Sequence, residues 1–387
     1  MEKKINLKIF SSKKNIEIES LVYGFNLFLP TFVLIISSLF KEYSLAAELG
    51  ILIGINIIFT QIFSANLRSI IISKNNTDNI YSHIVFRFLI AFFVLFVNVI
   101  IFYNYNFTYF EILSQITILI LIQWQCEIIL TYYEIKNNKK KFFQYLFVCF
   151  IFSLLIVGSF IFRYNFLSVL IFFNIIFSLF LIIGIFQIDK KLNSIKKIFF
   201  NIIKSSAFFS SLTISLSNLV WRLLILILCG KTLAGIYFAS FAIGSLPGTL
   251  FNNSFGPTML KKNLKIKYFE IFKSFSYLTI TFLMLVSLYH KDKIFFDNQF
   301  TQLFGTTISL VGAIFMIKGQ YYRQFIIQKT NYKSKLFNYD IIYSLIISLI
   351  VPFLFLIGGI KLIIISFLIS SLTSFGMYKL IYKNLWN

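Results

Sequence analysis

Acidic and catalytic residue types are scarce in this sequence of 387 residues. It holds 14 Asp and Glu against 36 Lys and Arg, with two histidines and three cysteines. The sequence contains no glycine-rich phosphate loop with a lysine, no His-Glu-x-x-His and no Asp-x-Asp motif. Cys126, Cys149 and Cys229 stand singly in apolar stretches, so they indicate neither a disulfide framework nor a metal site. We therefore expect no enzyme, no cofactor and no bound metal.

Long polar segments are also missing, which excludes an ordinary soluble protein. The chain is 58% hydrophobic and 13% charged, and its mean hydropathy is +0.83. A net charge of +22 would suggest nucleic acid in a soluble protein, but here the basic residues are spread over many loops without a recognition motif. We expect membrane lipids and no nucleic acid as partners.

Apolar runs of about 20 residues, each long enough to cross a bilayer as a helix, alternate with short polar loops. They are too long and too continuously apolar for barrel strands. The sequence therefore predicts an all-α, polytopic membrane protein with about 12 transmembrane helices. The predicted spans are 20–40, 45–66, 84–103, 109–133, 142–163, 167–187, 205–229, 231–253, 268–289, 301–319, 338–358 and 360–382.

Basic residues collect in every second loop. Of the 36 Lys and Arg, 29 fall on one predicted side, while Arg222 alone belongs to neither side. Short cytoplasmic loops carry an excess of Lys and Arg, so both termini are predicted to be cytoplasmic. The opposite side holds Lys41, Arg163, Lys231, Lys291, Lys293 and Lys361.

A short internal sequence repeat divides the chain into halves. Leu45-Ala46-Ala47 and Lys74-Asn75 bound the second span, as Leu233-Ala234-Gly235 and Lys262-Asn263 bound the eighth. The eighth span thus repeats the second span with the same orientation across the membrane. Such a repeat predicts two six-helix lobes related by a parallel pseudo-repeat. The expected organisation is a cytoplasmic N-terminal segment 1–19, an N-lobe 20–188, a cytoplasmic linker 189–204 and a C-lobe 205–387.

Arg222 is the basic residue placed deepest in an apolar span. An arginine inside a bilayer is costly, so it usually faces a cavity or a partner. It shares one helix face with three polar residues at spacings i, i+4, i+7 and i+11, and such a stripe suits an anionic headgroup. The alternative is that Arg222 reaches outward to the membrane interface. The predicted substrate-binding stripe is Ser211, Ser215, Asn218 and Arg222.

Glu127 is the carboxylate placed deepest in an apolar helix. It is a candidate coupling site for protons or cations, a partner for an arginine of the opposite lobe, or a structural hydrogen-bonding group. Glu48, nearer the outer end of its span, and Asp340, at a helix start, are expected to complement the helix dipole only. Four basic residues lie at the inner ends of spans: Arg68, Arg87, Lys318 and Arg323. They either rim a cytoplasmic entrance or anchor the helices. Among them, Arg68 and Lys318 are the predicted cavity residues.

The seventh and eighth spans carry the strongest resemblance to a known family. They read Asn218-Leu-Val-Trp-Arg222, followed by Cys229-Gly-Lys-Thr-Leu-Ala-Gly235-Ile-Tyr-Phe-Ala239. With the twelve-helix architecture, this resembles the multidrug/oligosaccharidyl-lipid/polysaccharide (MOP) exporter superfamily, and more specifically its Wzx-type flippases. Members commonly place an acid before the arginine, whereas this chain has Trp221 there.

The resemblance implies a flippase in the cytoplasmic (inner) membrane. It would move an undecaprenyl-pyrophosphate-linked oligosaccharide, an O-antigen or similar surface polysaccharide unit, across the membrane by alternating access, with other polysaccharide-assembly proteins as possible partners. The alternative on the same fold is a cation-coupled multidrug exporter, which would need intramembrane acids for cationic drugs. Because the interior is basic and poor in acids, the sequence favours anionic cargo.

Overall fold

The computed structural model describes residues 18–64, 67–68, 71, 80–104, 107–189, 194–204, 206–250, 281, 284, 297–328 and 333–386. Helices make up nearly all of this part of the chain, and no extended strand occurs in it. The all-α fold predicted from the sequence is therefore confirmed. Residues 1–17 of the predicted N-terminal segment, residues 261–273, which are rich in lysine, and nearly all of the predicted span 268–289 lie outside the described residues.

Six helices match the first six predicted spans within a few residues, and each is long enough to cross the ~30 Å core of a bilayer. Turns fix their ends: Lys41 and Arg163 have positive φ angles of 70° and 53°. The Asn165 side chain caps the sixth span by accepting the Leu167 N–H at 3.1 Å. The helices are α1 Ile18–Leu39, α2 Tyr43–Ser64, α4 Ile80–Asn104, α5 Phe110–Ile135, α6 Lys139–Phe162 and α7 Phe166–Phe186.

Helix α9, Ser206–Leu250, is a hairpin of the seventh and eighth predicted spans. Gly230 breaks it with φ 73° and ψ 171°, a conformation that favours glycine. Contacts with α2 show the reversal. Before the break, Ser215 contacts Gln61 and Arg222 contacts Gly50, so the two helices are antiparallel. After it, Gly235 lies against Tyr43 and Phe238 against Gly50, so they are parallel. The boundary predicted between 229 and 231 is confirmed.

The C-terminal region contains α12 Asn298–Gln328, α13 Lys333–Leu362, the short 3-10 helix Ile363–Ile365 and α14 Ser366–Trp386. Gly359, with φ 66°, breaks α13 at the predicted boundary between spans. Asp340 contacts Tyr378 and Tyr343 contacts Ser370, so α13 and α14 are antiparallel.

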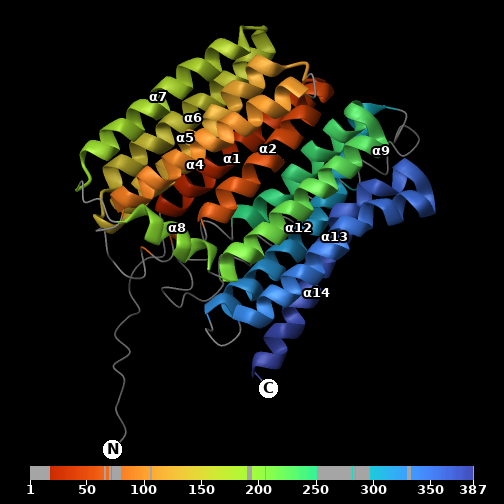
Figure 1. Cartoon of the computed structure of the whole chain (residues 1–387). Helices are drawn as coiled ribbons and strands as arrows, with labels where there is room; N and C mark the ends of the chain where they lie inside the picture. The colour runs from red at the N-terminus through yellow and green to blue at the C-terminus, as the bar shows by residue number, and fades with distance from the viewer. Residues whose placement is uncertain are drawn as a thin grey trace, which may run out of the picture.

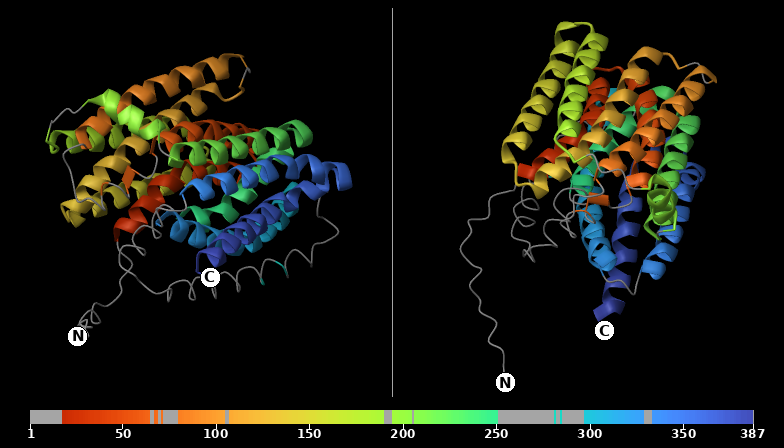
Figure 2. Two further views of the ribbon diagram at one scale, coloured as in Figure 1. Left: turned by 60° about the horizontal axis from the view of Figure 1, so that its bottom comes forward. Right: turned by 60° about the vertical axis from the view of Figure 1, so that its left-hand side comes forward.

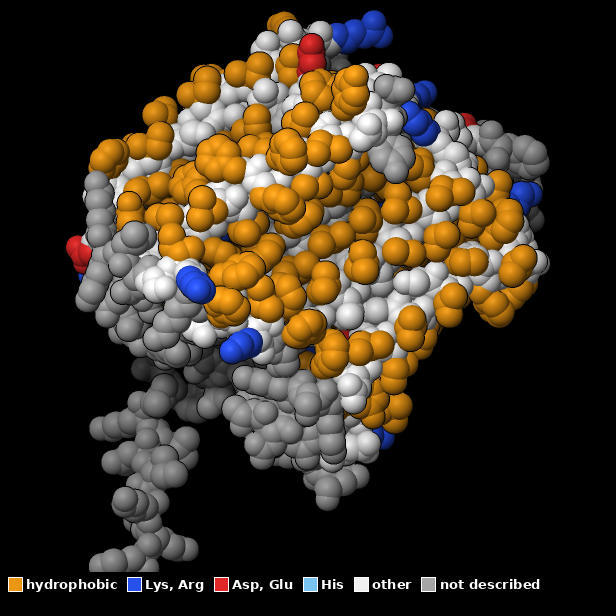
Figure 3. Space-filling view, viewed as in Figure 1, with side chains coloured by type: hydrophobic (Ala, Val, Ile, Leu, Met, Phe, Trp, Pro, Cys, Tyr) orange, Lys and Arg blue, Asp and Glu red, His pale blue; other side chains and the backbone are white. Residues whose placement is uncertain are grey.

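Nine stretches of the described chain are long and apolar enough to span a membrane. Two of these stretches are the hairpins broken at Gly230 and Gly359, so the described residues account for eleven of the twelve predicted crossings. The large exposed side chains support this placement, because aromatic and aliphatic groups cover the face shown in Figure 3. Phe92, Phe96 and Phe147 are each more than half exposed, as expected for helices that face lipid.

The helices form two sets that lie side by side, α1 to α7 and α9 to α14 (Figures 1 and 2). We call them the N-terminal and C-terminal lobes. Their packing repeats: α1 contacts α6 as α9 contacts α13, and α5 contacts α7 as α12 contacts α14. This order agrees with the predicted parallel repeat, while the predicted lobe boundaries stay a prediction.

The bundle has a lysine-poor end, where the turns at Lys41, Arg163, Gly230 and Gly359 lie, at the upper right of Figure 1. Its other end, where α14 ends, Lys136 follows α5 and Lys139 begins α6, is the lysine-rich end. Helix α2 makes the principal contact between the lobes, because it packs against both halves of α9.

Candidate functional site

Arg222 lies at the boundary between the lobes, nearer the lysine-poor end. Its guanidinium Nη1 donates a hydrogen bond across the boundary to the backbone carbonyl of Gly50 on α2. The guanidinium carbon lies 5.8 Å from the ring centroid of Phe238, in the second half of α9. Gly54 makes room for it, since a Cβ at that position would lie 3.3 Å from Arg222 Cδ. Arg222 therefore faces the other lobe, and its described partners are neutral.

The rest of the predicted polar stripe is only partly engaged with α2. Ser215 is buried and donates to Gln61 Oε1 at 2.9 Å, which makes a second polar contact between the lobes. Ser211 and Asn218 are half-buried. Two of the four stripe residues thus meet the opposite lobe, at positions about two turns apart.

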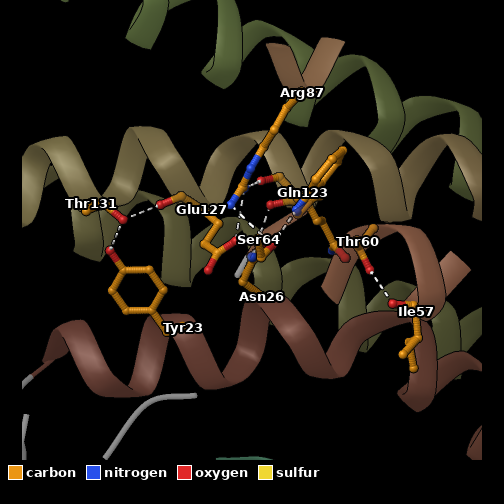
Figure 4. Close-up of polar contacts among 10 residues, drawn as sticks. Tyr23, Asn26, Ile57, Thr60, Ser64, Arg87, Gln123, Glu127 and Thr131 are labelled. Carbon is orange, nitrogen blue, oxygen red and sulfur yellow. Dashed lines mark hydrogen bonds and ion pairs between the residues drawn. The ribbon is translucent and has the colours of Figure 1, made fainter. Parts of the chain in front are cut away.

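Glu127 lies in a buried polar cluster inside the N-terminal lobe (Figure 4). Its carboxylate accepts from Arg87 Nη1 at 3.0 Å, and the Arg87 side chain is only 1% exposed. Ser64 accepts from Arg87 Nη2 at 3.2 Å and from the Trp124 indole N–H at 2.7 Å. Arg87 comes from α4, and Glu127 and Trp124 from α5. The suggested pairing of Glu127 with an arginine of the opposite lobe is therefore wrong.

A hydrogen-bonded chain extends this cluster toward α1 and α6. The Glu127 carbonyl accepts from Thr131, whose hydroxyl in turn accepts from Tyr23 at 3.2 Å. Asn26 donates to the Gln123 carbonyl at 3.1 Å and accepts from Tyr145. With Ser64 of α2 and Arg87 of α4, five helices of this lobe are thus joined by polar contacts: α1, α2, α4, α5 and α6.

Arg68 and Lys318, the other predicted cavity residues, lie within single lobes. Arg68 Nη2 pairs with Glu134 Oε2 at 3.1 Å, and its guanidinium lies over the Tyr23 ring at 3.4 Å from the centroid. The Arg68 side chain is 6% exposed, so it is buried rather than placed on a rim. Lys318 is half-buried, with Nζ 5.8 Å from the Phe375 ring centroid, and has no ion pair in the described part of the chain.

Asp340 was expected to serve only the helix dipole, and the structure gives it a larger role. It is fully buried in α13 and accepts from Arg323 at 3.1 Å. It also accepts from Ser210 on α9 and from Tyr378 on α14 at 2.5 Å. This one carboxylate joins four helices of the C-terminal lobe at the lysine-rich end. Arg323 is therefore engaged inside the lobe.

Glu48 was likewise expected to act on the helix dipole alone, which is wrong. Its side chain is 3% exposed and pairs with Lys231 Nζ at 2.7 Å, across the lobe boundary at the lysine-poor end. It also accepts the backbone N–H groups of Thr108 and Tyr109 at 3.3 Å each. Glu48 therefore holds the start of α9's second half to the N-terminal lobe.

Carboxylates inside the described bundle are neutralised. The other described acids, Glu19, Glu42, Glu111, Asp189 and Asp297, lie at helix ends or in turns. Among the described residues, no group of three His, Cys, Asp or Glu side chains could hold a metal ion. The four interior acids and their partners are Glu48 with Lys231, Glu127 with Arg87, Glu134 with Arg68 and Asp340 with Arg323.

No protein-family model matches the chain, and no curated protein matches it either. Solved structures do match over almost its full length. An inward-facing MATE-family multidrug resistance transporter of the MOP superfamily gives a TM-score of 0.53 at 11% identity, covering 95% of this chain and 98% of the other. The outward-facing form gives 0.54 at 12%, covering 97% and 99%.

A third match is a MOP superfamily transporter from Pyrococcus furiosus Vc1, described by the reverse polarity of its binding pocket. Its TM-score is 0.52 at 10% identity, covering 97% of this chain and 100% of the other. Identities this low show the fold alone. The chain has the transporter fold of the MATE family of the MOP superfamily.

Proposed function

We propose that this chain is a flippase that moves an undecaprenyl-pyrophosphate-linked oligosaccharide from the cytoplasmic to the outer leaflet by alternating access. The cargo class is an O-antigen or similar surface-polysaccharide unit. One observation carries the proposal: Arg222 faces the lobe boundary without a carboxylate, whereas every interior acid of the described bundle has a basic partner.

The chemistry of a lipid diphosphate fits this arrangement. A pyrophosphate crossing the hydrocarbon region needs a positive group at the boundary between lobes, while its polyprenyl tail stays in lipid. A guanidinium binds phosphate oxygens through two parallel charge-assisted hydrogen bonds, which are stronger than its bond to the neutral Gly50 carbonyl. Cargo therefore displaces the carbonyl as the partner of Arg222.

A cation-coupled multidrug exporter is the second candidate, because two of the matched structures are multidrug resistance transporters. A cationic drug would need an unneutralised acid. The described interior acids are all paired, so this candidate needs Glu127 to leave Arg87 during transport. The Arg87–Glu127 pair is then the coupling device, since protonating Glu127 would release it.

Reconstituted vesicles test the cargo directly. The probe is a polyprenyl-pyrophosphate disaccharide with a fluorescent label, and an impermeant quencher added outside reports its movement. We expect faster quenching with the wild-type chain, about tenfold slower transport for Arg222→Ala, and partial activity for Arg222→Lys. The matched control cargo is the same labelled disaccharide on a polyprenyl alcohol, which lacks phosphate.

Equal transport by wild type and Arg222→Ala would overturn the role of Arg222. Export of a cationic dye without movement of the pyrophosphate lipid would establish the multidrug alternative instead. In the source cell, deletion of the gene should remove surface glycan and raise the undecaprenyl-linked unit in the cytoplasmic leaflet.

The proposed direction requires the lysine-rich end to face the cytoplasm. Asn298 is exposed at the start of α12, at the opposite end. In a Cys229→Ser background, Asn298→Cys should react with an impermeant maleimide on intact cells. Reaction only after permeabilisation would reverse the proposed orientation.

A further inference from the structure

A short helix joins the two lobes at the lysine-rich end, inside the segment that the sequence suggested was only a linker. Helix α8, Ile195–Ile203, follows α7 and precedes α9. In Figure 1 it lies across the lower end of the N-terminal lobe rather than along the transmembrane helices. A helix in this position runs in the plane of the membrane surface.

The sequence of α8 is amphipathic. Ile195, Ile198, Phe199 and Ile202 follow spacings of i, i+3, i+4 and i+7, which places them on one face. This face packs partly on the protein: α8 contacts α4, and the ring centroid of Phe199, which is 36% exposed, lies 6.2 Å from that of Phe86. The apolar stripe therefore orients the helix against the end of the N-terminal lobe.

A second face of α8 is basic and points away from the protein. Lys196, Phe200 and Lys204 follow one another at intervals of four residues, and all three are exposed. The Lys204 N–H donates to the Phe200 carbonyl at 3.0 Å, so Lys204 continues the last helical turn. Phe200 is 47% exposed between the two lysines. In the described part of the chain, neither lysine forms an ion pair, unlike Arg68, Arg87 and Arg323.

We propose that α8 is a docking surface for the anionic phospholipid headgroups of the leaflet at the lysine-rich end. The ammonium groups of Lys196 and Lys204 bind lipid phosphates, and Phe200 enters the boundary between headgroups and acyl chains. The sequence from 190 to 204 holds five lysines, and clusters of this size beside a transmembrane helix or on an amphipathic helix are typical of binding to anionic lipid.

Lipid bound to α8 acts on the contact between the lobes through a row of aromatic rings. Phe199 contacts Phe86 of α4, which lies 5.8 Å from Phe63 of α2. Phe63 in turn contacts Phe208 of α9, with ring centroids 6.3 Å apart, and this pair crosses the lobe boundary. Anchoring α8 therefore stabilises the lobe contact at this end. This proposal depends on placement in the membrane and not on the identity of the cargo.

Amide hydrogen exchange of the full chain in lipid nanodiscs measures the docking. We expect residues 195–203 to exchange several-fold more slowly in nanodiscs that contain phosphatidylglycerol than in phosphatidylcholine alone. Each lysine near an anionic surface strengthens binding by about fivefold, so Lys196→Gln with Lys204→Gln should remove most of the difference. Added salt should reduce it as well.

The matched control is the Lys139→Gln, Lys140→Gln pair, which removes two exposed lysines at the same end from a transmembrane helix. This variant should keep the full lipid dependence. Equal exchange of 195–203 in both lipids would overturn the proposal. So would slowing by inorganic pyrophosphate in phosphatidylcholine nanodiscs without any effect of phosphatidylglycerol, because α8 would then bind the phosphate of the cargo rather than the membrane.

Discussion

Arg87 and Arg222 both lie in apolar helices, but their surroundings differ. Arg87 is 1% exposed and meets a carboxylate, a serine hydroxyl and a backbone carbonyl, all within the N-terminal lobe. Arg222 is half-buried, and its guanidinium meets the Gly50 carbonyl of the other lobe and lies over the Phe238 ring. The first charge is neutralised inside one lobe, and the second lies at the boundary between the two lobes.

This difference indicates that the Arg87 guanidinium stabilises the fold, whereas the Arg222 guanidinium is available to a ligand. Removing one partner of a buried ion pair strands the other charge, which is expensive. Removing a cation that has only a neutral acceptor strands no charge. Arg87 should therefore matter most for stability, and Arg222 for transport.

Arg87→Leu should cause the largest loss, about 3–5 kcal/mol in the free energy of unfolding, because Glu127 then stays in the interior without its cation. Denaturant titration of the purified protein in detergent measures it. The double variant Arg87→Leu, Glu127→Leu should recover most of the loss, since no charge remains. If the double variant is as unstable as the single one, the pair is not what holds α4 to α5.

Gly235→Ala should cost less, about 1–3 kcal/mol, by forcing apart α9 and α2 at a close backbone contact between the lobes. A Cβ at Gly235 would overlap the backbone carbonyl of Tyr43, which cannot rotate away as a side chain can. Gly376→Ala is the matched control, because a Cβ there meets no atom within 4 Å. The control should be neutral or slightly stabilising. Equal stability of the two variants would contradict the close contact at the lysine-poor end.

Arg222→Leu should change stability by only about 1 kcal/mol while slowing the proposed transport about tenfold. This outcome would be the reverse of the Arg87 variant, and it sharpens the distinction between the two arginines. Both quantities come from one preparation: the unfolding titration in detergent and the vesicle assay with the labelled pyrophosphate lipid. A loss of stability as large as that of Arg87→Leu would place Arg222 among the residues that build the fold.

The transmembrane helices could be predicted from sequence because hydropathy is a local property. The break at Gly230 fell where two apolar runs meet, and the six N-terminal helices agree with their predicted spans within a few residues. The position of Arg222 within an apolar run could be read from the sequence for the same reason. Its partner on α2 was not, since Gly50 lies 172 residues away in the sequence.

The polar pairs could not be predicted because each depends on helices brought together only by folding. Glu127 and Arg87 are 40 residues apart, and Lys231 and Glu48 are 183 apart. From their positions in the sequence alone, Glu48 and Asp340 were predicted only to complement helix dipoles, although both are buried and form ion pairs. Helix α8 is different. The spacing of Ile195, Ile198, Phe199 and Ile202 is a local signal that could have identified it.

Lys231→Gln should cause the smallest change, at most about 1 kcal/mol, because the Lys231 side chain is 49% exposed and water solvates it when the pair is lost. Glu48→Gln should cost more, because that carboxylate is buried and also accepts two backbone N–H groups. Loss of this ion pair should therefore lower the free energy of unfolding by different amounts, depending on which partner is replaced.

Lys231→Glu should in addition push the lobes apart at the lysine-poor end, since it places two carboxylates together. Maleimide labelling of the half-buried Cys229, two residues before Lys231, reports this opening. We expect faster labelling in Lys231→Glu than in Lys231→Gln, and equal rates in the two variants would show that the pair does not close this end.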